Sequence, residues 1–142
     1  VAIIPVPPDG DLVLIEEWRQ PVGAISRGIP AGTVTPDDAD RRTAAARELR
    51  EETGHTADGW EQLFTVDPAN GLLDSPTTYF LATGAERTLS PDLDVDESIR
   101  TTVMSPRTVW EDLASGVIRD LRCRLALTHL IANGHAVTAG LR

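Results

Sequence analysis

The acidic cluster at residues 47–54 combines residue types and spacing that are suited to chemistry. Glu48 and Glu52 are four residues apart, so on a helix they lie on one face, one turn above the other, with Glu51 beside them. Three carboxylates this close repel one another and need a counter-charge. Neighbouring arginines on a solvated face provide one solution, and a hard divalent cation provides another, because Mg²⁺ takes oxygen ligands and shares substrate phosphates. The cluster therefore predicts either a solvated helix face or a magnesium site.

A second acidic group follows later in the chain and precedes a predicted strand. Taken alone, it is compatible with an acidic surface loop. A side chain at the start of a strand can also be held over a neighbouring site, so the group is a candidate partner for the first cluster. Its members are Asp92, Asp94, Asp96 and Glu97.

Composition limits the functions that these acids can serve. The chain has 142 residues, which suits one domain over 1–142, and its net charge of −9 argues against a protein that binds nucleic acid. No apolar run is long enough for a membrane span. The single cysteine, Cys123, excludes an internal disulfide and fits a reducing, cytoplasmic location. Because aromatic residues make up only 4% of the chain, we assign Trp18, Tyr79 and Phe80 to the core rather than to base stacking.

The order of predicted elements favours a mixed α/β (α+β) layer fold rather than a regular βαβ alternation. Strands at 1–6 and 12–18 flank Asp9-Gly10, a dipeptide typical of hairpin turns. Further extended segments are expected at 25–34, 60–66, 77–82 and 98–104, and helices at 36–53, 106–114 and 119–133.

The helix at 36–53 carries the acidic cluster, and its ends are marked by specific residues. Thr35 is the expected N-cap, Pro36 takes the first helical position and Asp38 the third. Gly54 is a typical residue after the last turn.

The run from Gly32 to Gly54 resembles the Nudix box, G-x5-E-x7-R-E-U-x-E-E-x-G-U, in which U is aliphatic. The core from Arg47 to Gly54 is complete. Asp38 replaces the first Glu, and eight residues rather than seven separate it from Arg47, which we interpret as one extra residue in the first helical turn. His55 takes the last aliphatic position, and we expect it to be a tolerated substitution.

Shorter motifs over residues 1–134 are similar to the ADP-ribose pyrophosphatase-like branch of this family. They lie at 18–23 (WRQPVG), 29–32 (IPAG), 97–100 (ESIR) and 116–120 (GVIRD). Two positions depart from the branch, because Gly28 and Ser75 stand where acidic residues are common. The sequence also lacks the N-terminal arm that the branch uses for dimerisation and adenine binding.

The resemblance implies a Nudix fold, in which helices sandwich a mixed β-sheet core. It further implies a pyrophosphohydrolase that depends on Mg²⁺ or Mn²⁺ and cleaves ADP-ribose, or a related nucleoside diphosphate sugar, to a nucleoside monophosphate and a sugar phosphate. The expected partner is this small nucleotide, without nucleic acid or membrane, and the expected assembly is a homodimer. Another X-linked nucleoside diphosphate, or a non-catalytic Nudix-like binding module, is the alternative.

The resemblance also implies roles for residues in the box. Glu48 and Glu52 are the expected metal ligands, together with the backbone carbonyl of Ala31. Glu51 would ligate a further ion or position a metal-bound water. Arg47 is an expected catalytic residue, because it would orient the carboxylates.

Outside the box, Glu97 is the expected general base, with Asp96 as its competitor. Arg19 and Gly32 are expected to bind substrate. Arg19 would contact a phosphate or ribose, since a guanidinium matches phosphate geometry. An ordinary surface arginine at a strand end is the alternative for Arg19.

Overall fold

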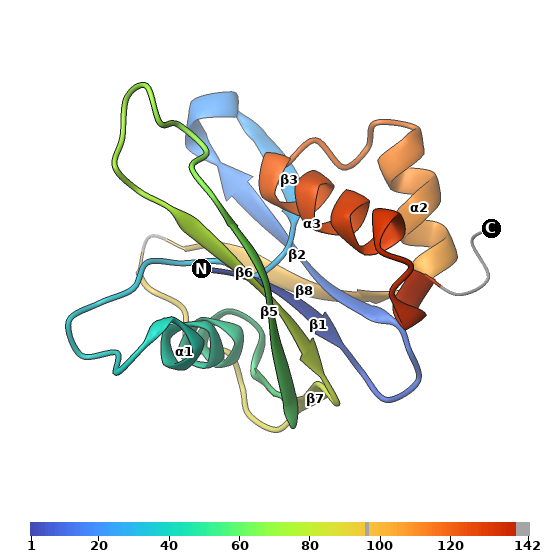
Figure 1. Ribbon diagram of the computed structural model, residues 1–142, viewed down its shortest axis with the longest axis horizontal. Coiled ribbons are helices and arrows are strands. Elements are labelled where there is room, and N and C mark those ends of the chain that lie inside the picture. Colours follow the sequence, from blue (N-terminus) through green and yellow to red (C-terminus); the bar gives the residue numbers. More distant parts are fainter. Residues whose placement is uncertain (96, 139–142) are drawn as a thin grey trace.

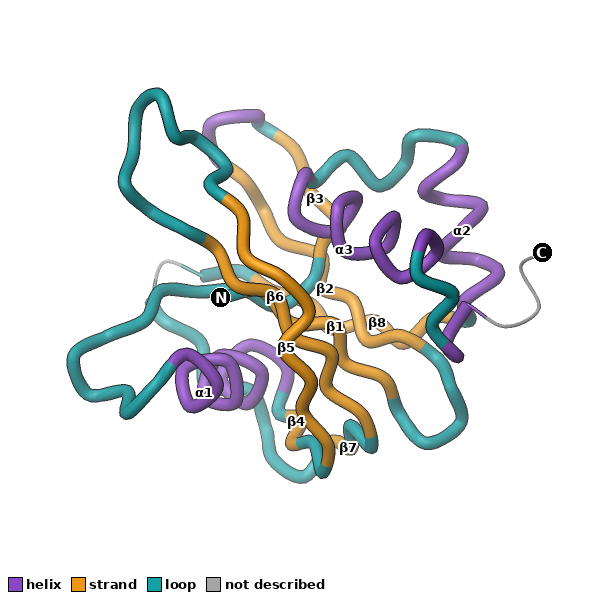
Figure 2. The backbone as a smooth tube through the Cα atoms, in the orientation of Figure 1, coloured by secondary structure: helices purple, strands orange, loops and turns teal. Residues whose placement is uncertain are grey.

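The computed structural model describes residues 1–95 and 97–138, in which strands and helices form the expected α+β class (Figures 1 and 2). In chain order the elements are β1 (Ala2–Val6), β2 (Leu12–Arg19), η1 (Gln20–Val22), β3 (Ala24–Gly28), α1 (Arg41–Thr53), β4 (His55–Thr56), β5 (Gly59–Val66), β6 (Thr77–Thr83), β7 (Glu86–Arg87), β8 (Ile99–Met104), α2 (Pro106–Ala114), α3 (Leu121–Ala132) and η2 (Ala136–Thr138).

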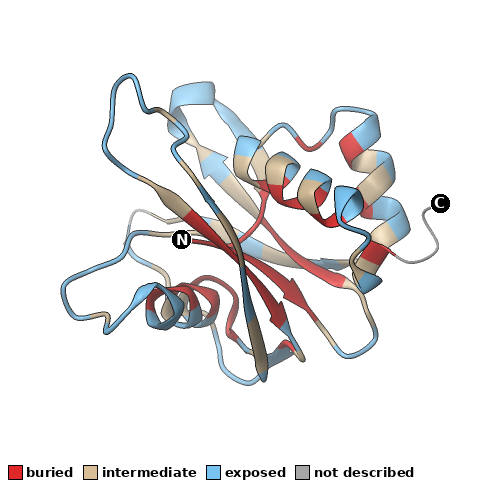
Figure 3. Cartoon of the chain, viewed as in Figure 1, coloured by how far each residue is buried: buried red, intermediate tan, exposed pale blue. Residues whose placement is uncertain are grey.

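The sheet formed by β1, β6 and β5 is covered on both faces. β1 pairs in parallel with β6, and β5 pairs antiparallel with β6. Because successive side chains of a strand point to opposite faces, the two faces build two separate hydrophobic clusters (Figure 3). One cluster joins the sheet to α1 and contains Val1, Ile3, Ala44, Ala45, Leu49, Phe80 and Ala82.

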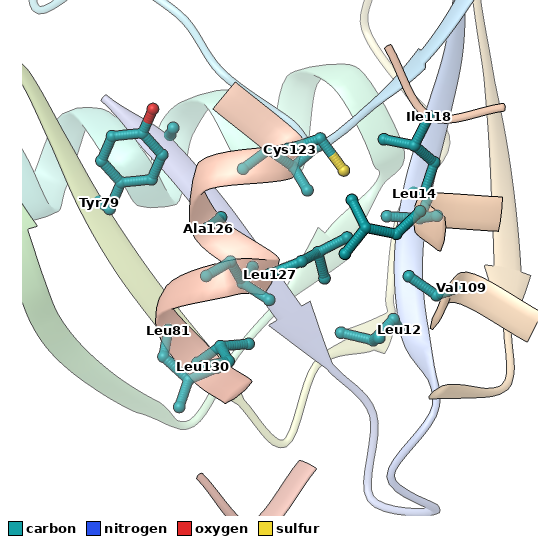
Figure 4. Close-up of a cluster of buried hydrophobic side chains, with 14 of the residues drawn as sticks. Leu12, Leu14, Tyr79, Leu81, Val109, Ile118, Cys123, Ala126, Leu127 and Leu130 are labelled. Atoms are coloured by element: carbon teal, nitrogen blue, oxygen red, sulfur yellow. The ribbon is translucent and has the colours of Figure 1, made fainter. Parts of the chain in front are cut away.

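The opposite face of this sheet packs against α3, α2 and the second sheet (Figure 4). The second sheet is antiparallel, in the order β3-β2-β8. Helices therefore lie on both sides of the strands, as the fold class predicts. The buried residues of this larger cluster include Ala2, Ile4, Leu12, Leu14, Tyr79, Leu81, Val109, Leu113, Cys123, Ala126, Leu127 and Leu130.

Tyr79 and Phe80 are buried in the core, as predicted, but the prediction is wrong for Trp18. The side chain of Trp18 is 50% exposed, because its position on β2 points away from both clusters, opposite Ile25 of β3.

The predicted hairpin between the first two strands is wrong. The turn forms, since Gly10 has a φ of +87° and its N–H donates to the carbonyl of Pro7 at 3.0 Å, but the strands that it joins belong to different sheets. Every residue of β1 is buried, which requires neighbours on all sides. β6 lies on one edge of β1, and Ala31 forms an antiparallel bridge with Ala2 on the other.

The start of α1 also differs from the prediction. The helix begins at Arg41 rather than at residue 36, and the N-cap is Asp40, whose Oδ1 accepts from the N–H of Thr43 at 2.7 Å. The side chain and N–H of Thr35 instead donate to Oδ2 of Asp38, at 3.0 and 2.8 Å. These contacts close a turn before the helix, so Asp38 lies outside the helix rather than at its predicted third position.

The C-terminal end of α1 brings the second acidic group beside the first. Gly54 ends the helix as predicted, with a φ of +72°, and a Cβ there would lie 2.2 Å from the carbonyl oxygen of Leu89. The N–H groups of Thr88 and Leu89 donate to the carbonyl of Gly54, and the N–H of Asp92 donates to that of Glu51 at 2.8 Å. Backbone hydrogen bonds thus hold the acidic connection against the helix end.

Candidate active site

Carboxylates from both acidic groups line one cavity of about 290 Å³, the carboxylate cavity. The structure therefore brings the two groups together, as the sequence led us to expect. Asp96, the competing general base, lies outside the described residues. The cavity is lined by Ala31, Gly32, Thr33, Thr35, Arg47, Glu48, Glu51, Glu52, Asp92, Asp94 and Glu97.

Glu52 is the deeply buried carboxylate of this cavity, at 4% exposure. Its Oε2 accepts a hydrogen bond from the N–H of Ala31 at 3.1 Å, and it forms no ion pair within the described part of the chain. Burial raises the pKa of Glu52 to about 8. Burial also raises the pKa of Glu48, which is 9% exposed, although the nearby Arg47 guanidinium opposes the shift. A cavity with two such carboxylates favours a cation.

Glu48 reaches its position because residue 32 has no side chain. A Cβ on Gly32 would lie 2.0 Å from the carboxyl carbon of Glu48, so the carboxylate occupies the space that any other residue would fill. β1 fixes this segment, since the N–H of Ile3 donates to the carbonyl of Pro30 at 2.8 Å. The Pro30-Ala31-Gly32 segment is thus a rigid wall against which both carboxylates pack.

Arg47 links the carboxylates to the loop before the helix. Its Nη1 lies 2.9 Å from Oε1 of Glu48 and 2.9 Å from Oε2 of Glu51. Its other nitrogens donate to both oxygens of Asp38 at 3.0 Å, and Nη2 donates to the carbonyl of Thr33 at 2.9 Å. The hydrogen bonds from Arg47 hold the pKa of Asp38 well below its usual range, and they raise the pKa of Arg47. These contacts suit the orienting role predicted for Arg47.

Glu97 is held by its own loop at the edge of the cavity. Its Oε2 accepts from the N–H of Asp94 at 3.1 Å, while its own N–H donates to the carbonyl of Asp94 at 3.0 Å. This closed turn leaves the carboxylate of Glu97 facing the space where the carboxylate cavity meets a second, larger cavity.

The oxygen donors of the carboxylate cavity fit a hard divalent cation. Their chemistry is that of Mg²⁺ ligands, and Glu52 carries a buried carboxylate without a cationic partner in the described ranges. Within those ranges, no set of three or more acidic, His or Cys side chains is gathered as a complete metal site. Arg47 instead contacts Glu48 and Glu51, so it neutralises part of the charge that a cation would otherwise balance.

The second cavity has a volume of about 540 Å³ and we name it the arginine cavity. It shares Ala31, Gly32, Thr33, Glu52 and Glu97 with the carboxylate cavity, so the two cavities adjoin. The loop between β5 and β6, which projects beyond the sheet in Figure 2, contributes Asp74 to its wall. The arginines that line it are Arg19, Arg41 and Arg122.

Arg19 was a predicted site residue, whereas Arg41 and Arg122 were missed. Arg19 lies in the arginine cavity, and its Nη2 is 2.7 Å from Oε2 of Glu17. A signal for Arg41 exists in the sequence, since it precedes Glu48 by seven residues, about two helical turns, and so shares its face. Arg122 has no such local signal, because only the packing of α3 against the sheet brings it to the cavity.

The remaining predictions concern residues away from these cavities. Cys123 is a free, buried thiol, and burial raises its pKa to about 12, so it packs as a core residue. His55 is also buried, with Nδ1 3.1 Å from the carbonyl oxygen of Thr53. Over residues 1–95 and 97–138, none of the helices combines the length and apolarity that crossing a membrane requires.

Comparison with protein families gives a match to the NUDIX domain model over residues 1–120. The chain is 31% identical over 143 residues to an ADP-ribose pyrophosphatase of Mycobacterium tuberculosis (strain ATCC 25618 / H37Rv), with 99% of this chain and 66% of that protein covered. It is also 31% identical over 131 residues to a methanol dehydrogenase activator of Bacillus methanolicus, with 92% and 70% covered. The chain thus spans about two thirds of the length of these relatives.

A solved structure, described as an ADP compounds hydrolase, has the same fold. Its TM-score is 0.80 at 22% identity, over 96% of this chain and 73% of the other. This likeness confirms the predicted architecture of a mixed sheet between helices.

Proposed function

The chain belongs to the NUDIX family, and from that premise we propose that it hydrolyses ADP-ribose or a related nucleoside diphosphate sugar with the help of Mg²⁺ or Mn²⁺. The predicted membership of the chain in the Nudix family and in its ADP-ribose pyrophosphatase-like branch is confirmed. The chain is therefore a Nudix hydrolase by class. The observation that carries the proposed reaction is the buried carboxylate of Glu52. It lies where the two cavities meet, and among the described residues it has no cationic partner.

In this proposal Glu48 and Glu52 hold the cation with the carbonyl of Ala31, and Glu51 holds a further ion or orients a water molecule. The cation, when bound, offsets the charge of the diphosphate and polarises a phosphoryl oxygen. Arg47 holds the carboxylates of Glu48 and Glu51 in place beside the loop at Thr33, because it contacts both carboxylates and the carbonyl of Thr33 at 2.9 Å.

Glu97 is the proposed general base. It takes a proton from water as the water oxygen attacks phosphorus and a P–O bond of the diphosphate breaks, which gives a nucleoside monophosphate and a sugar phosphate. The N–H of Asp94 holds the carboxylate of Glu97 in place at 3.1 Å. Arg19 would bind a phosphate or ribose of the substrate, with Gly32 forming the wall beside it.

A panel of nucleotide sugars and dinucleotides, incubated with Mg²⁺ or Mn²⁺ and followed by phosphate release after phosphatase treatment, tests the proposal. We expect turnover with ADP-ribose or a related compound, its loss in Glu52→Gln and its retention in Glu111→Gln, a control on the exposed face of α2. Binding across the panel without turnover would contradict hydrolysis and support the non-catalytic binding module. An unchanged kcat in Glu97→Gln would refute the assignment of the base.

We also propose that the protein is a homodimer and that it is located in the cytoplasm. Its proposed binding partner is the small-molecule substrate. Support for a dimer comes from exposed apolar side chains around a cavity of about 500 Å³, namely Val22, Ile25, Val117 and Leu121. The single reduced thiol of Cys123 supports the location. Sedimentation equilibrium should give the dimer mass, and a monomer at micromolar concentration would refute this assembly.

A further inference from the structure

The arginine cavity extends farther from the carboxylates than a diphosphate reaches. Arg41 and Glu52 are eleven positions apart on α1, which corresponds to about 16 Å between their backbone positions along the helix axis, whereas a diphosphate is only about one helical turn long. Side chains of a helix all incline toward its N-terminus, so those of Arg41 and Glu52 lean in the same direction and this separation is not closed. Both residues nevertheless line one continuous cavity. An anion at the Arg41 end is therefore a different group from the diphosphate at Glu48 and Glu52.

Two arginines of this cavity, Arg41 and Arg122, retain the capacity to bind an anion. In the described residues no carboxylate lies within ion-pair distance of Arg41, whose Nη1 donates to Oγ1 of the buried Thr78 at 3.2 Å. The nearest carboxylate oxygen to Arg122 is that of Asp120 at 3.7 Å, too far for a hydrogen bond. Arg19, whose Nη2 lies 2.7 Å from Oε2 of Glu17, is already assigned to a phosphate or ribose of the substrate.

Thr78 gives Arg41 a fixed position at the wall of the cavity. Its hydroxyl is 2.9 Å from that of Thr65 on the neighbouring strand β5, so the hydroxyl that receives Arg41 is itself anchored in the sheet. A guanidinium that is held at one nitrogen keeps other N–H donors for a ligand, and its planar fork suits a phosphate.

The composition of the wall favours phosphate over a nucleobase at this end. Among the described residues, none of the side chains that line the arginine cavity is aromatic, so the wall offers no ring on which a base could stack. Its cations are arginines contributed by α1, α3 and the end of β2. The same wall also carries four acids, two of which line the carboxylate cavity as well: Glu17, Glu52, Asp74 and Glu97.

We propose that Arg41 and Arg122 bind a phosphate monoester that is separated from the scissile diphosphate by one sugar ring. The inference rests on the proposed hydrolysis and narrows its substrate class to nucleoside diphosphate sugars that carry a third phosphate. That phosphate has two possible sources, the ribose of the nucleoside or the distal sugar.

Kinetics with three substrates test this subsite and separate the sources. They are ADP-ribose, 2′-phospho-ADP-ribose and ADP-ribose 1″-phosphate. We expect one phosphorylated substrate to have a kcat/KM at least about tenfold above that of ADP-ribose, since a charge-assisted contact changes binding by about one order of magnitude or more. The compound that gains identifies the sugar that carries the phosphate.

Arg41→Gln and Arg122→Gln should each reduce this preference about tenfold, mainly through KM. Arg42→Gln is the matched control, because Arg42 is an exposed neighbour on α1 outside both cavities and should keep the preference. Equal kcat/KM values for the three substrates, or a preference that survives in Arg41→Gln, would overturn the proposal. Arg41→Gln alters an exposed position and keeps the test valid if Arg122→Gln fails to fold.

A binding measurement keeps this test separate from that of hydrolysis. Calorimetric titration of the wild type and both variants in EDTA with the same three compounds reports the subsite without turnover. Tighter binding of a phosphorylated compound that depends on Arg41 supports the subsite even where no substrate is cleaved, and only the hydrolysis proposal then fails. Equal affinities for all three compounds refute the subsite.

Discussion

Removing the charge of Glu52 should stabilise the protein in alkaline solution when no divalent cation is present. The carboxylate is 4% exposed and has no cationic partner in the described residues, so its charged form is costly in the folded state. In Glu52→Gln the amide has nearly the same shape, and its oxygen can still accept from the N–H of Ala31. The substitution therefore removes a buried charge while it keeps the hydrogen bond.

The size of the effect follows from the pKa of Glu52. The pKa is about 8 in the folded protein against an ordinary value of 4.5 for a glutamate in water. Between these values the folded state keeps a proton that the unfolded state has lost, so the free energy of unfolding falls as the pH rises through this window. The difference, about 8 minus 4.5, corresponds to at most about 5 kcal/mol, and we expect about 2–5 kcal/mol once water enters the site.

Urea unfolding in EDTA at about pH 5, 7 and 9 measures this difference. The variant and wild type should have similar stability at the lowest pH, and the advantage of the variant should grow to its full size at the highest. Added Mg²⁺ should restore the stability of the wild type and not that of the variant, because a cation that binds only the folded state stabilises it. A variant that is less stable than the wild type at high pH in EDTA, or a difference that does not change with pH, would refute the reasoning.

Three further substitutions test the packing around the site. Gly32→Ala places a Cβ 2.0 Å from the carboxyl carbon of Glu48, so we expect kcat to fall about 100-fold with little change in melting temperature, as measured by phosphate release and calorimetry. Gly54→Ala meets both the φ of +72° and the carbonyl of Leu89 at 2.2 Å, and should lower the free energy of urea unfolding by about 2 kcal/mol or more. Cys123→Ser buries a hydroxyl where the structure has a thiol of raised pKa, and should cost about 1–3 kcal/mol by the same measurement.

The local part of the fold follows from the sequence, and the long-range pairing does not. Alternating or continuous apolar residues predict the strands, and Gly54 predicts the end of α1, because these signals act within one turn or one strand. The Asp9-Gly10 turn also forms, yet the strand before it pairs with β6, more than 70 residues later. The pairing of β1 with β6 buries both faces of β1, and the residues of the turn do not determine which strand pairs with β1.

The start of α1 shows how two local signals can compete. Thr35 and Asp40 both have side chains that can cap a helix, and both precede acceptable helix formers. The contact of Asp38 with Arg47 decides between them, since it holds residues 35–38 in a separate turn beside the helix. A capping pattern alone does not contain that contact between residues nine positions apart.

The candidate site divides along the same line. The carboxylates of α1 can be predicted from their spacing, and the second acidic group from its place before a strand. Arg122 comes from a helix that packs against the other face of the sheet, so its approach to the cavity is a property of the assembled layers. Residue spacing therefore predicts the carboxylates on one helix better than it predicts residues such as Arg122, which reach the cavity from another element.

The pairing of Gly32 with Glu48 explains why the start of the box is structural as well as chemical. Two buried carboxylates on one helix face repel each other and lose hydration, so they stay buried only if backbone closes over them. The 30–32 segment does this because its antiparallel bridge to β1 fixes its height above α1, and because residue 32 leaves room for a carboxylate. A side chain at this position would push Glu48 toward solvent and remove the unbalanced charge that gives the cavity its affinity for a cation.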